Sequence, residues 1–581
     1  MYSLVSVTGG CVQSQFFCRK SIDKLLADAD APDRRLRKTL GVLSLTALGI
    51  GAIIGTGIFV LTGTAAAGES AQEASLLKTP LLTVIMHGGQ QLLTGRPGAG
   101  PSIALSFFLV AIACGLAGLC YAELASMIPI AGSAYTYSYA TLGELVAWII
   151  GWDLILEYAV SNMAVAVGFS AYIKDLFAGF GLNIPLELGT PAYTPDGGWT
   201  LHFNIVGFVV VMVLTVLLVR GIKESASANT FMVGVKLTAI LLFVFIASKY
   251  IKPINWHPFM PAGWQGVMTG GAIVFFTYIG FDSVSTAAEE CKNPKRDLPL
   301  GILLSLLVCT VLYVSVAVVL TGIQPYQIFK GDAAPVATAL HNIHLDGLRR
   351  WVTIGALTGM ISSLLVFQLG QARVWFAMSR DRLLPDAFSR VHPRFRTPST
   401  ATWVAGFFVG IPAGIFDIGT LADLSNIGTL FAFVLVSLAV LILRSTQADR
   451  PRSFRVPLVW FVAPGSVVCC LVLMMGLPVE NWIRFVVWLV IGMLLYLSYG
   501  VRRSSSGAEL APADRMFCLA KADRALIALA GVLLALGLVV VVSIFRGSLE
   551  ADTGHISEAV VLLALGGPFV FIGMRNLKKD C

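Results

Sequence analysis

The stretch LGIGAIIGTGIFVLTG, residues 48–63, carries the feature that decides the fold. Gly49, Gly51, Gly55 and Gly57 lie at its centre, inside an otherwise apolar run. A glycine inside a helix costs about 1 kcal/mol relative to alanine, so this density predicts an apolar helix that is unwound in its middle. Close packing against a neighbouring helix is the alternative, because Gly51 and Gly55 form a GxxxG pair.

A second apolar stretch is interrupted in the same way. GGAIVFFTYIGFDSVSTAAEE, residues 270–290, has Gly280 and the charged Asp282 near its middle. Unwound backbone inside a bilayer is tolerated only where protein or a cavity surrounds it. The two interrupted stretches begin two successive sets of five apolar segments, and corresponding breaks of this kind point to the binding site of a transporter. The second break weakens the packing alternative for the first.

The composition places both stretches in a membrane protein. Of 581 residues, 56% are hydrophobic and 13% are charged, whereas soluble domains carry roughly 25% charged residues. A soluble enzyme and a disordered chain are both excluded. A spanning helix needs roughly 20 mostly apolar residues, and about fourteen segments qualify. They are approximately 40–64, 102–127, 143–176, 201–219, 226–248, 264–288, 299–321, 351–378, 399–415, 420–443, 456–476, 482–500, 524–545 and 557–574.

These segments predict an all-α integral membrane fold in several parts. A ten-helix core over 40–443, with a long external loop at 65–101, follows a cytoplasmic segment at 1–39. The core is followed by helices 11 and 12 (444–500), a charged cytoplasmic linker (501–523), a terminal helix pair (524–574) and a cytoplasmic tail (575–581).

The charge distribution supports this arrangement. The formal net charge is +8, and most of the 41 lysines and arginines fall on alternate connections between the predicted helices. By the positive-inside rule, this asymmetry predicts that both termini are cytoplasmic. The basic balance therefore reflects topology, and no nucleic-acid partner is expected. The ten cysteines fall within predicted helices or on the predicted cytoplasmic side, so neither a structural disulfide nor a metal site is expected.

Four long segments give the chain a family resemblance. They are GIGAIIGTGIFVLTG (49–63), AGLCYAELASMIPIAGSAYTYSYATLGELVAWIIGWDLILEY (117–158), FFTYIGFDSVSTAAEECKNPKRDLPLGI (275–302) and GQARVWFAMSRDRLLP (370–385). In these segments the chain resembles the amino acid–polyamine–organocation superfamily of permeases, and within it the cationic amino acid transporter family. The resemblance implies a five-plus-five inverted repeat with substrate held between broken helices 1 and 6. It weakens after about residue 480.

The first break can hold the carboxylate of an amino acid. A carboxylate needs hydrogen-bond donors and positive potential, which the free amides at the start of a half-helix supply. The amides of Gly55, Thr56 and Gly57 are the predicted donors. Ile53 is expected to line the same site through its match to the family motif.

The second break can hold the ammonium group. The unwound carbonyls of Phe275, Phe276 and Ile279 are the predicted acceptors. Phe276 also resembles the aromatic gate of related carriers, with ordinary packing as the alternative.

Lys236 is a charged residue halfway along the fifth predicted helix, in NTFMVGVKLTAILLF. A charge at this depth costs at least ~2.5 kcal/mol. Burial disfavours the charged form of a lysine, so Lys236 can exchange protons. In proton-coupled relatives, a lysine at the matching place stands where sodium-coupled carriers hold an ion. The resemblance therefore implies a proton as the coupling ion and no other cofactor. A fixed structural ion pair is the alternative.

Three acids lie near the predicted site. Asp153 and Glu157 are four residues apart and share one helix face, and family resemblance places Glu157 nearer the substrate. A carboxylate there favours lysine, arginine or ornithine, although Glu157 can instead be a core acid or a partner of Lys236. Asp282 is a candidate for a proton or gating network or for a helix cap. Glu123 and Arg373 are expected to form structural contacts on the cytoplasmic side.

The sequence therefore predicts a secondary active transporter of the cell membrane, the inner membrane in a bacterium. Its expected activity is proton-coupled uptake of L-amino acids with a cationic preference. A broad or neutral amino acid permease or exchanger is the main alternative, followed by a sensor that keeps the carrier fold. No catalytic motif supports an embedded enzyme, and single acids on separate helices do not form the charged ring of a channel.

Overall fold

The computed structural model describes residues 15–29, 38–68, 79–87, 96–178, 181–182, 184–194, 198–220, 222–332, 334–395, 397–416, 418–508, 512–545 and 566–576. Within these ranges, nine helical spans are long and apolar enough to cross a membrane, and three shorter apolar helices accompany them. The chain is thus a helical integral membrane protein. The predicted span 557–574 lies partly outside the described residues, so the count of fourteen stays a prediction.

The apolar helices follow the predicted segments closely. Their bounds are α2 (Val42–Ile53) with η2 (Gly57–Leu61) and α3 (Thr62–Ala67), α5 (Ile103–Met127), α7 (Glu144–Ala178), α9 (Ile205–Arg220), α10 (Ile222–Ala247), α11 (Gly263–Val274) with η6 (Phe275–Tyr278) and α12 (Ser283–Thr286), α13 (Pro294–Ile323), α15 (Asp346–Arg380), α16 (Ser399–Ile415), α17 (Ile418–Thr446), α18 (Val459–Met475) and α19 (Val479–Leu495) with η10 (Tyr496–Gly500).

Shorter elements flank or connect these helices. They are η1 (Gln15–Phe17), α1 (Ile22–Ala29), α4 (Leu81–His87), η3 (Gly100–Ser102), α6 (Ala134–Thr141), α8 (Leu186–Gly189), η4 (Ser248–Tyr250), η5 (Pro253–Trp256), η7 (Ala288–Glu290), η8 (Tyr326–Phe329), α14 (Pro335–Asn342), η9 (Asp386–Ser389), α20 (Val501–Arg503) and α21 (Ser505–Ala508). The last long helix, α22 (Pro512–Phe545), has 34 residues and contains the predicted span 524–545. Strands β1 (Tyr193–Thr194) and β2 (Gly198–Trp199) form a small antiparallel ladder that pairs Tyr193 with Trp199.

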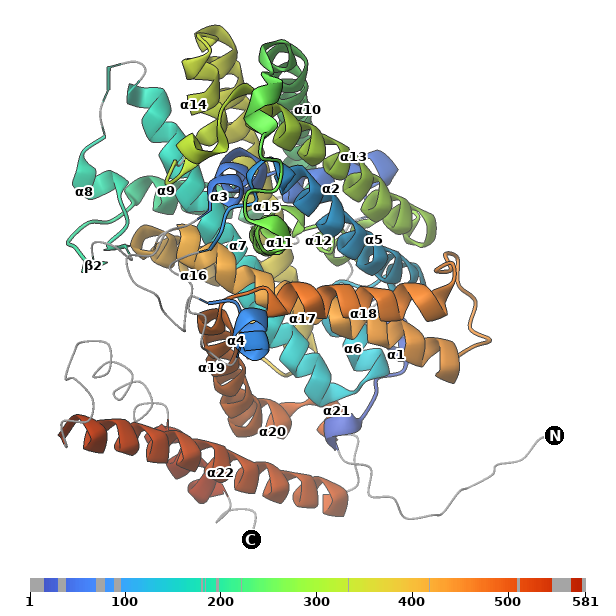
Figure 1. The fold of residues 1–581 in the computed structure, drawn as a ribbon. Helices are drawn as coiled ribbons and strands as arrows, with labels where there is room; N and C mark the ends of the chain where they lie inside the picture. The colour runs from blue at the N-terminus through green and yellow to red at the C-terminus, as the bar shows by residue number, and fades with distance from the viewer. Residues whose placement is uncertain are drawn as a thin grey trace.

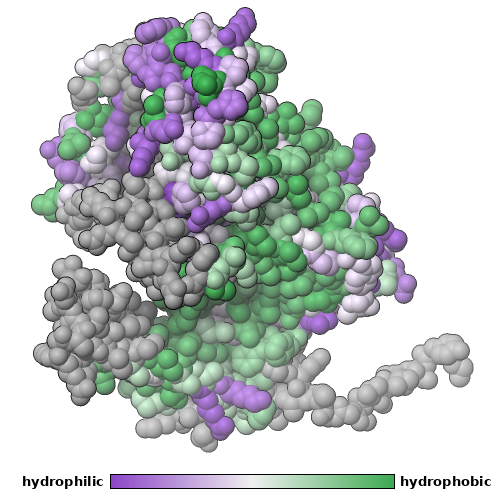
Figure 2. Space-filling view, viewed as in Figure 1, coloured by the Kyte–Doolittle hydropathy of each residue, from purple (hydrophilic) through white to green (hydrophobic). Residues whose placement is uncertain are grey.

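The bundle has two polar ends. In Figure 1, α14 lies at the upper end, whereas α1, α6, α20 and α21 lie towards the lower end. Figure 2 shows hydrophobic residues in a broad band across the visible face, with hydrophilic residues gathered above it. Helix α14, from a connection predicted to be external, thus lies far from α20 and α21, which were predicted to be cytoplasmic (Figure 1).

Both predicted helix breaks are present. Helix α2 ends at Ile53, Ile54 has extended backbone, and the chain resumes as a π-helix at Gly57. In the second segment, α11 gives way to a 3-10 turn, Ile279 is extended, and Gly280 has a φ of 118°. The first break is shorter than expected, because Gly49 and Gly51 remain inside α2.

Close packing explains the two glycines that stay helical. A Cβ at Gly51 would lie 2.6 Å from Oδ1 of Asn229 and 2.8 Å from Oγ of Ser362. A Cβ at Gly49 would lie 2.5 Å from Oγ of Ser305 on α13. The packing alternative therefore holds for these two positions, and the unwound backbone is confined to the residues that follow them.

Packing is most extensive between a few pairs of long helices. Helix α7 packs against α15 and α17, α10 packs against α15, and α13 packs against both α5 and α2. Helices α9 and α16 form a further pair. The two broken segments meet one another at η2 and η6, inside this arrangement.

Gln15 connects the first described segment to the lower end of the bundle. Its fully buried amide donates to Oε1 of Glu144 (3.1 Å) and to the carbonyl of Val501 (2.8 Å). Glu144 also accepts hydrogen bonds from the hydroxyls of Tyr496 (3.0 Å) and Ser504. The region 501–523, predicted as a linker, is thus partly helical, and its first residues close over Glu144.

Candidate substrate and coupling site

The two helix breaks lie directly against each other. A Cβ at Gly57 would lie 2.6 Å from Cγ2 and 2.9 Å from Cα of Thr277, so only glycine allows this approach. The hydroxyl of Tyr313 lies 2.7 Å from the carbonyl of Ile53 and 2.8 Å from that of Thr277. Tyr313, on α13, therefore links the two breaks through carbonyls that the unwound backbone exposes.

The first break only partly provides the predicted donors. The amide of Gly55 donates to the carbonyl of Ile53 (3.1 Å), so it is not free, contrary to the sequence prediction. This tight turn forms because the chain leaves the helix at Ile54. Thr56 and Gly57 lie at the start of the following half-helix, where amides have no preceding carbonyl to pair with. The Thr56 hydroxyl is buried without a partner.

The second break differs from the prediction at one carbonyl. Phe276 accepts a hydrogen bond from the amide of Ile279 (3.3 Å), so its carbonyl is already engaged within the 3-10 turn. The rings of Phe275 and Phe433 pack with centroids 6.0 Å apart, which attaches this turn to α17. The side chains of Phe275, Phe276 and Ile279 are all buried.

Lys236 is inserted into the first break. Its fully buried ammonium group donates to the carbonyls of Ile50 (2.9 Å), Gly51 (3.0 Å) and Ile54 (2.8 Å). Three acceptors match the three protons of a charged lysine. The ammonium group therefore holds the end of α2 in its unwound form, and it is paired with backbone rather than with Glu157.

Further polar side chains hold α2 against α10 and α15. Asn229 donates to the carbonyl of Ala47 (3.1 Å) and accepts a hydrogen bond from Ser362 (2.6 Å). Ser363 donates to the carbonyl of Ala52. These contacts were not predicted, because the sequence does not show which side chains of α10 and α15 face the break.

The acids of α7 present the opposite situation. Glu157 is buried, and neither of its carboxylate oxygens has a hydrogen-bond partner. Asp153 is also buried without a partner on either oxygen. If ionised, Glu157 would be repelled by both Asp153 and Asp282. The site therefore contains acceptor groups that no side chain of the described residues satisfies.

Asp282 belongs to this group through Tyr158. The Tyr158 hydroxyl donates to Oδ2 of Asp282, whereas Oδ1 has no partner. Asp282 stands at the start of α12, but its side chain makes no capping hydrogen bond there. The cap alternative is therefore wrong, and Asp282 is joined to the α7 face that carries Glu157.

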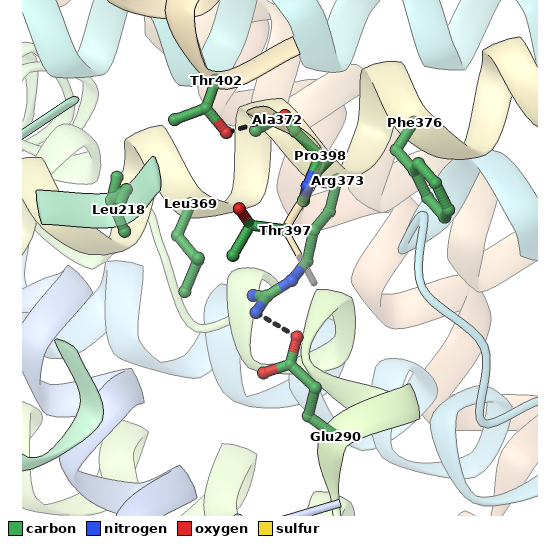
Figure 3. Close-up of a pocket in the computed structure, with 9 residues that line it drawn as sticks. All are labelled: Leu218, Glu290, Leu369, Ala372, Arg373, Phe376, Thr397, Pro398 and Thr402. Carbon is green, nitrogen blue, oxygen red and sulfur yellow. Dashed lines mark hydrogen bonds and ion pairs between the residues drawn. The ribbon is translucent and has the colours of Figure 1, made fainter. Parts of the chain in front are cut away.

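A separate group of charges lies beyond the second break. Figure 3 shows Arg373 of α15 directed towards Glu290 of η7, and the two side chains form a buried ion pair beside a cavity of about 20 Å³. Arg380, further along α15, forms a second ion pair with Glu289 (3.3 Å). Burial raises the pKa of Glu290, and the charge of Arg373 opposes this effect. The structural contact predicted for Arg373 is present.

Glu123 likewise has the predicted structural role. Its carboxylate accepts hydrogen bonds from Arg444 (2.8 and 2.7 Å) and from the amide of Val456 (2.7 Å), and Arg452 lies 3.1 Å away. Among the described residues, no group of three or more His, Cys, Asp or Glu residues could hold a metal ion.

The arrangement of two facing broken helices around a buried lysine is that of a carrier, and sequence comparison agrees. A family model described as amino acid permease matches residues 40–499. The chain belongs to the amino acid permease family. This family lies in the amino acid–polyamine–organocation superfamily that the four quoted segments resemble, so the protein is a permease rather than an enzyme. The match ends before α20, so α22 lies outside it.

Relatives within this permease family are named for different substrates. The chain is 45% identical over 493 residues to the branched-chain amino acid permease BcaP of Bacillus subtilis, covering 85% of this permease and 99% of the relative. It is 43% identical over 493 residues to the methylthioribose transporter of the same species, covering 84% and 99%. It is 35% identical over 438 residues to the vacuolar cationic amino acid transporter 4 of Arabidopsis thaliana, covering 74% and 67%.

Proposed function

We propose that this permease takes up L-amino acids together with protons by alternating access. One observation carries the proposal: the ammonium group of Lys236 donates to three carbonyls of the unwound end of α2. A protonated lysine stabilises the conformation in which this backbone stays in place. Loss of the proton removes a donor and favours release of the break. A proton is then a ligand with different affinity for two conformations, as coupling requires.

A five-plus-five inverted repeat is part of the proposal, and the packing pattern supports it. The repeat pairs α2 with α11, α5 with α13, α7 with α15, α9 with α16, and α10 with α17. If the two halves are equivalent, a contact between two helices should have a counterpart between their partners. The α10–α15 contact has such a counterpart in the α17–α7 contact, and both are present. The same equivalence relates the α2–α13 contact to α11–α5, and the α16–α7 contact to α15–α9. Two halves related by a pseudo-two-fold axis produce such matched contacts.

The substrate proposed first is a cationic amino acid. The α-carboxylate would meet the amides of Thr56 and Gly57, and the ammonium would meet backbone acceptors at the end of η6, where Ile279 has extended backbone. Glu157 is buried with both oxygens unpartnered, so it offers a charge-assisted hydrogen bond to a lysine, arginine or ornithine side chain. The cationic amino acid transporter among the relatives agrees with this choice.

A neutral substrate is the second candidate. The relative of 45% identity is named a branched-chain amino acid permease, and many residues around the breaks are apolar, including Ile53, Phe275 and Ile279. A protonated Glu157 would then be a neutral neighbour of an aliphatic side chain. The different cargo named for the methylthioribose transporter shows that high identity alone does not select a substrate.

We further propose that the protein resides in the cell membrane, with both termini in the cytoplasm. The distribution of lysine and arginine over the predicted connections supports this orientation. Two bacterial relatives aligned over 99% of their length support the same membrane.

The decisive experiment is uptake into proteoliposomes of purified protein. The panel contains the proteinogenic amino acids, ornithine and methylthioribose, each with and without an inward proton gradient and in sodium-free buffer. Saturable accumulation of an amino acid that the proton gradient increases supports the proposal. A strict sodium requirement contradicts proton coupling, and binding without uptake identifies a sensor. Cadaverine should compete poorly with lysine, because it lacks the carboxylate that the first break recognises.

A further inference from the structure

Asp153 is a buried acid that the proposed transport cycle does not use. It lies one turn before Glu157 on α7, its side chain is fully buried, and neither carboxylate oxygen has a partner. A Cβ at Gly428 of α17 would lie 2.5 Å from Oδ1 of Asp153. The carboxyl group is therefore pressed against the backbone of α17, where the missing side chain of glycine leaves room for it.

The surroundings of Asp153 provide no compensation for a negative charge. Ser161 and Ser425 bond to each other across the same helix contact (2.6 Å), and Thr429 donates to the carbonyl of Ser425 (3.1 Å). None of these hydroxyls donates to Asp153. In the described part of the chain, no lysine, arginine or histidine acts on Asp153.

Glu157 is the titratable group that faces Asp153. It lies on the same helix, is itself unpartnered, and interacts with Asp153 and Asp282. Two neighbouring carboxylates without a cation repel each other when both are ionised. An isolated ion in such a site costs several kcal/mol even after the protein relaxes, and the group becomes neutral instead.

We propose that Asp153 holds a proton in this conformation and is a second proton-binding residue of the carrier, separate from Lys236. The O–H bond of the acid breaks, and the proton passes to water, only when α17 moves away from α7 and water reaches the carboxyl group. A neutral Asp153 keeps the contact between α7 and α17 dry, and an ionised Asp153 would open it. The inference goes beyond the proposed function, because it holds for a cationic or a neutral substrate.

Infrared difference spectroscopy of the full-length protein in lipid at neutral pH tests this directly. The carbonyl stretch of a protonated carboxyl group is the signal, recorded for the wild type and for Asp153→Asn. Loss of one component of this signal in Asp153→Asn is the expected result. A spectrum that matches the wild type in this region would overturn the inference, since Asp153 would then be ionised.

A second set of variants tests the inference without Asp153→Asn, in case that variant does not fold. In the double variant Glu157→Gln with Asp282→Asn, Asp153 is the remaining acid of this group. A protonated-acid signal that persists there, and that disappears when α7 and α17 are forced apart by Gly428→Ala, supports the inference, and its absence in the double variant contradicts it. Absent uptake with the signal present would count against the proposed transport function and leave this inference intact.

Discussion

Two buried charged regions of this permease differ in how they are satisfied. The ammonium group of Lys236 has three carbonyl partners within 3.0 Å. The carboxylates of Asp153 and Glu157 have none, although they are buried just as deeply. In this conformation the lysine therefore stabilises the backbone around it, whereas Glu157 remains available for a cationic ligand and Asp153 carries the proposed proton. The difference indicates that α10 fixes the first break through Lys236, whereas α7 offers unpartnered acids to a ligand or a proton.

Removing the charge of Lys236 is the most severe way to break this comparison. Lys236→Met keeps much of the side-chain volume but leaves the carbonyls of Ile50, Gly51 and Ile54 without their donor. We expect complete loss of accumulation driven by a pH gradient, while substrate binding persists. Uptake is measured in proteoliposomes at several pH gradients. A full response to the gradient in Lys236→Met would exclude this lysine as the coupling residue.

A third buried charge, which has an ionic partner, sharpens the comparison. Arg373→Met leaves Glu290 buried without its cation, and breaking such a pair costs about 3–5 kcal/mol. We expect a lower melting temperature and faster alkylation of the neighbouring buried Cys291, whose pKa burial raises to about 11. Arg373→Met with Glu290→Leu removes both charges and should recover most of the stability. Equal stability of the single and double variants would argue against the pair.

Neutralising Glu157 tests whether the acids of α7 bind a cationic substrate. A charge-assisted hydrogen bond contributes about 1.5–3 kcal/mol, so Glu157→Gln should raise the KM for arginine or lysine roughly 10- to 100-fold. The KM for alanine or leucine should change little. Competition uptake assays with both substrate classes provide the measurement. A wild type that never transports a cationic amino acid would rule out the cationic preference and leave the family assignment intact.

The smallest effect is expected from a change that alters geometry and no charge. Gly57→Ala places a methyl group 2.9 Å from Cα of Thr277, which separates the two breaks at a cost of about 1–3 kcal/mol. Gly115→Ala on α5 is the matched control, because a Cβ there meets nothing within 4 Å. Substrate affinity, read from thermal stabilisation by the substrate, should fall for Gly57→Ala alone. Unchanged affinity would show that the break does not contact substrate.

Local composition determined much of what could be predicted. The density of glycine located the first break, and Gly280 with the charged Asp282 located the second. The single lysine of the predicted span 226–248 identified the residue that binds the first break. The free amide assigned to Gly55 was wrong, because the exact turn that follows Ile54 depends on backbone angles that composition does not specify. Gly49 and Gly51 show the same limit, since a glycine needed for packing looks like one needed for unwinding.

Partners from distant helices could not be predicted. Tyr313 and Tyr158 complete the site through hydrogen bonds to Ile53, Thr277 and Asp282. The rotation of each helix determines such contacts, and a nearly uniform apolar sequence carries little information about it. A tyrosine in an apolar run does offer one signal, because its buried hydroxyl needs a partner.

The position of Gln15 has a consequence for biosynthesis. This residue is synthesised long before its partners, yet its amide binds Glu144 and the carbonyl of Val501, and Ser504 completes the same group. The early segment cannot reach its final place until nearly five hundred further residues have been synthesised and inserted. Until then, Glu144 lacks several of its donors. Newly made chains therefore pass through a stage in which Glu144 is still without the hydrogen bonds that Gln15, Tyr496 and Ser504 donate to it.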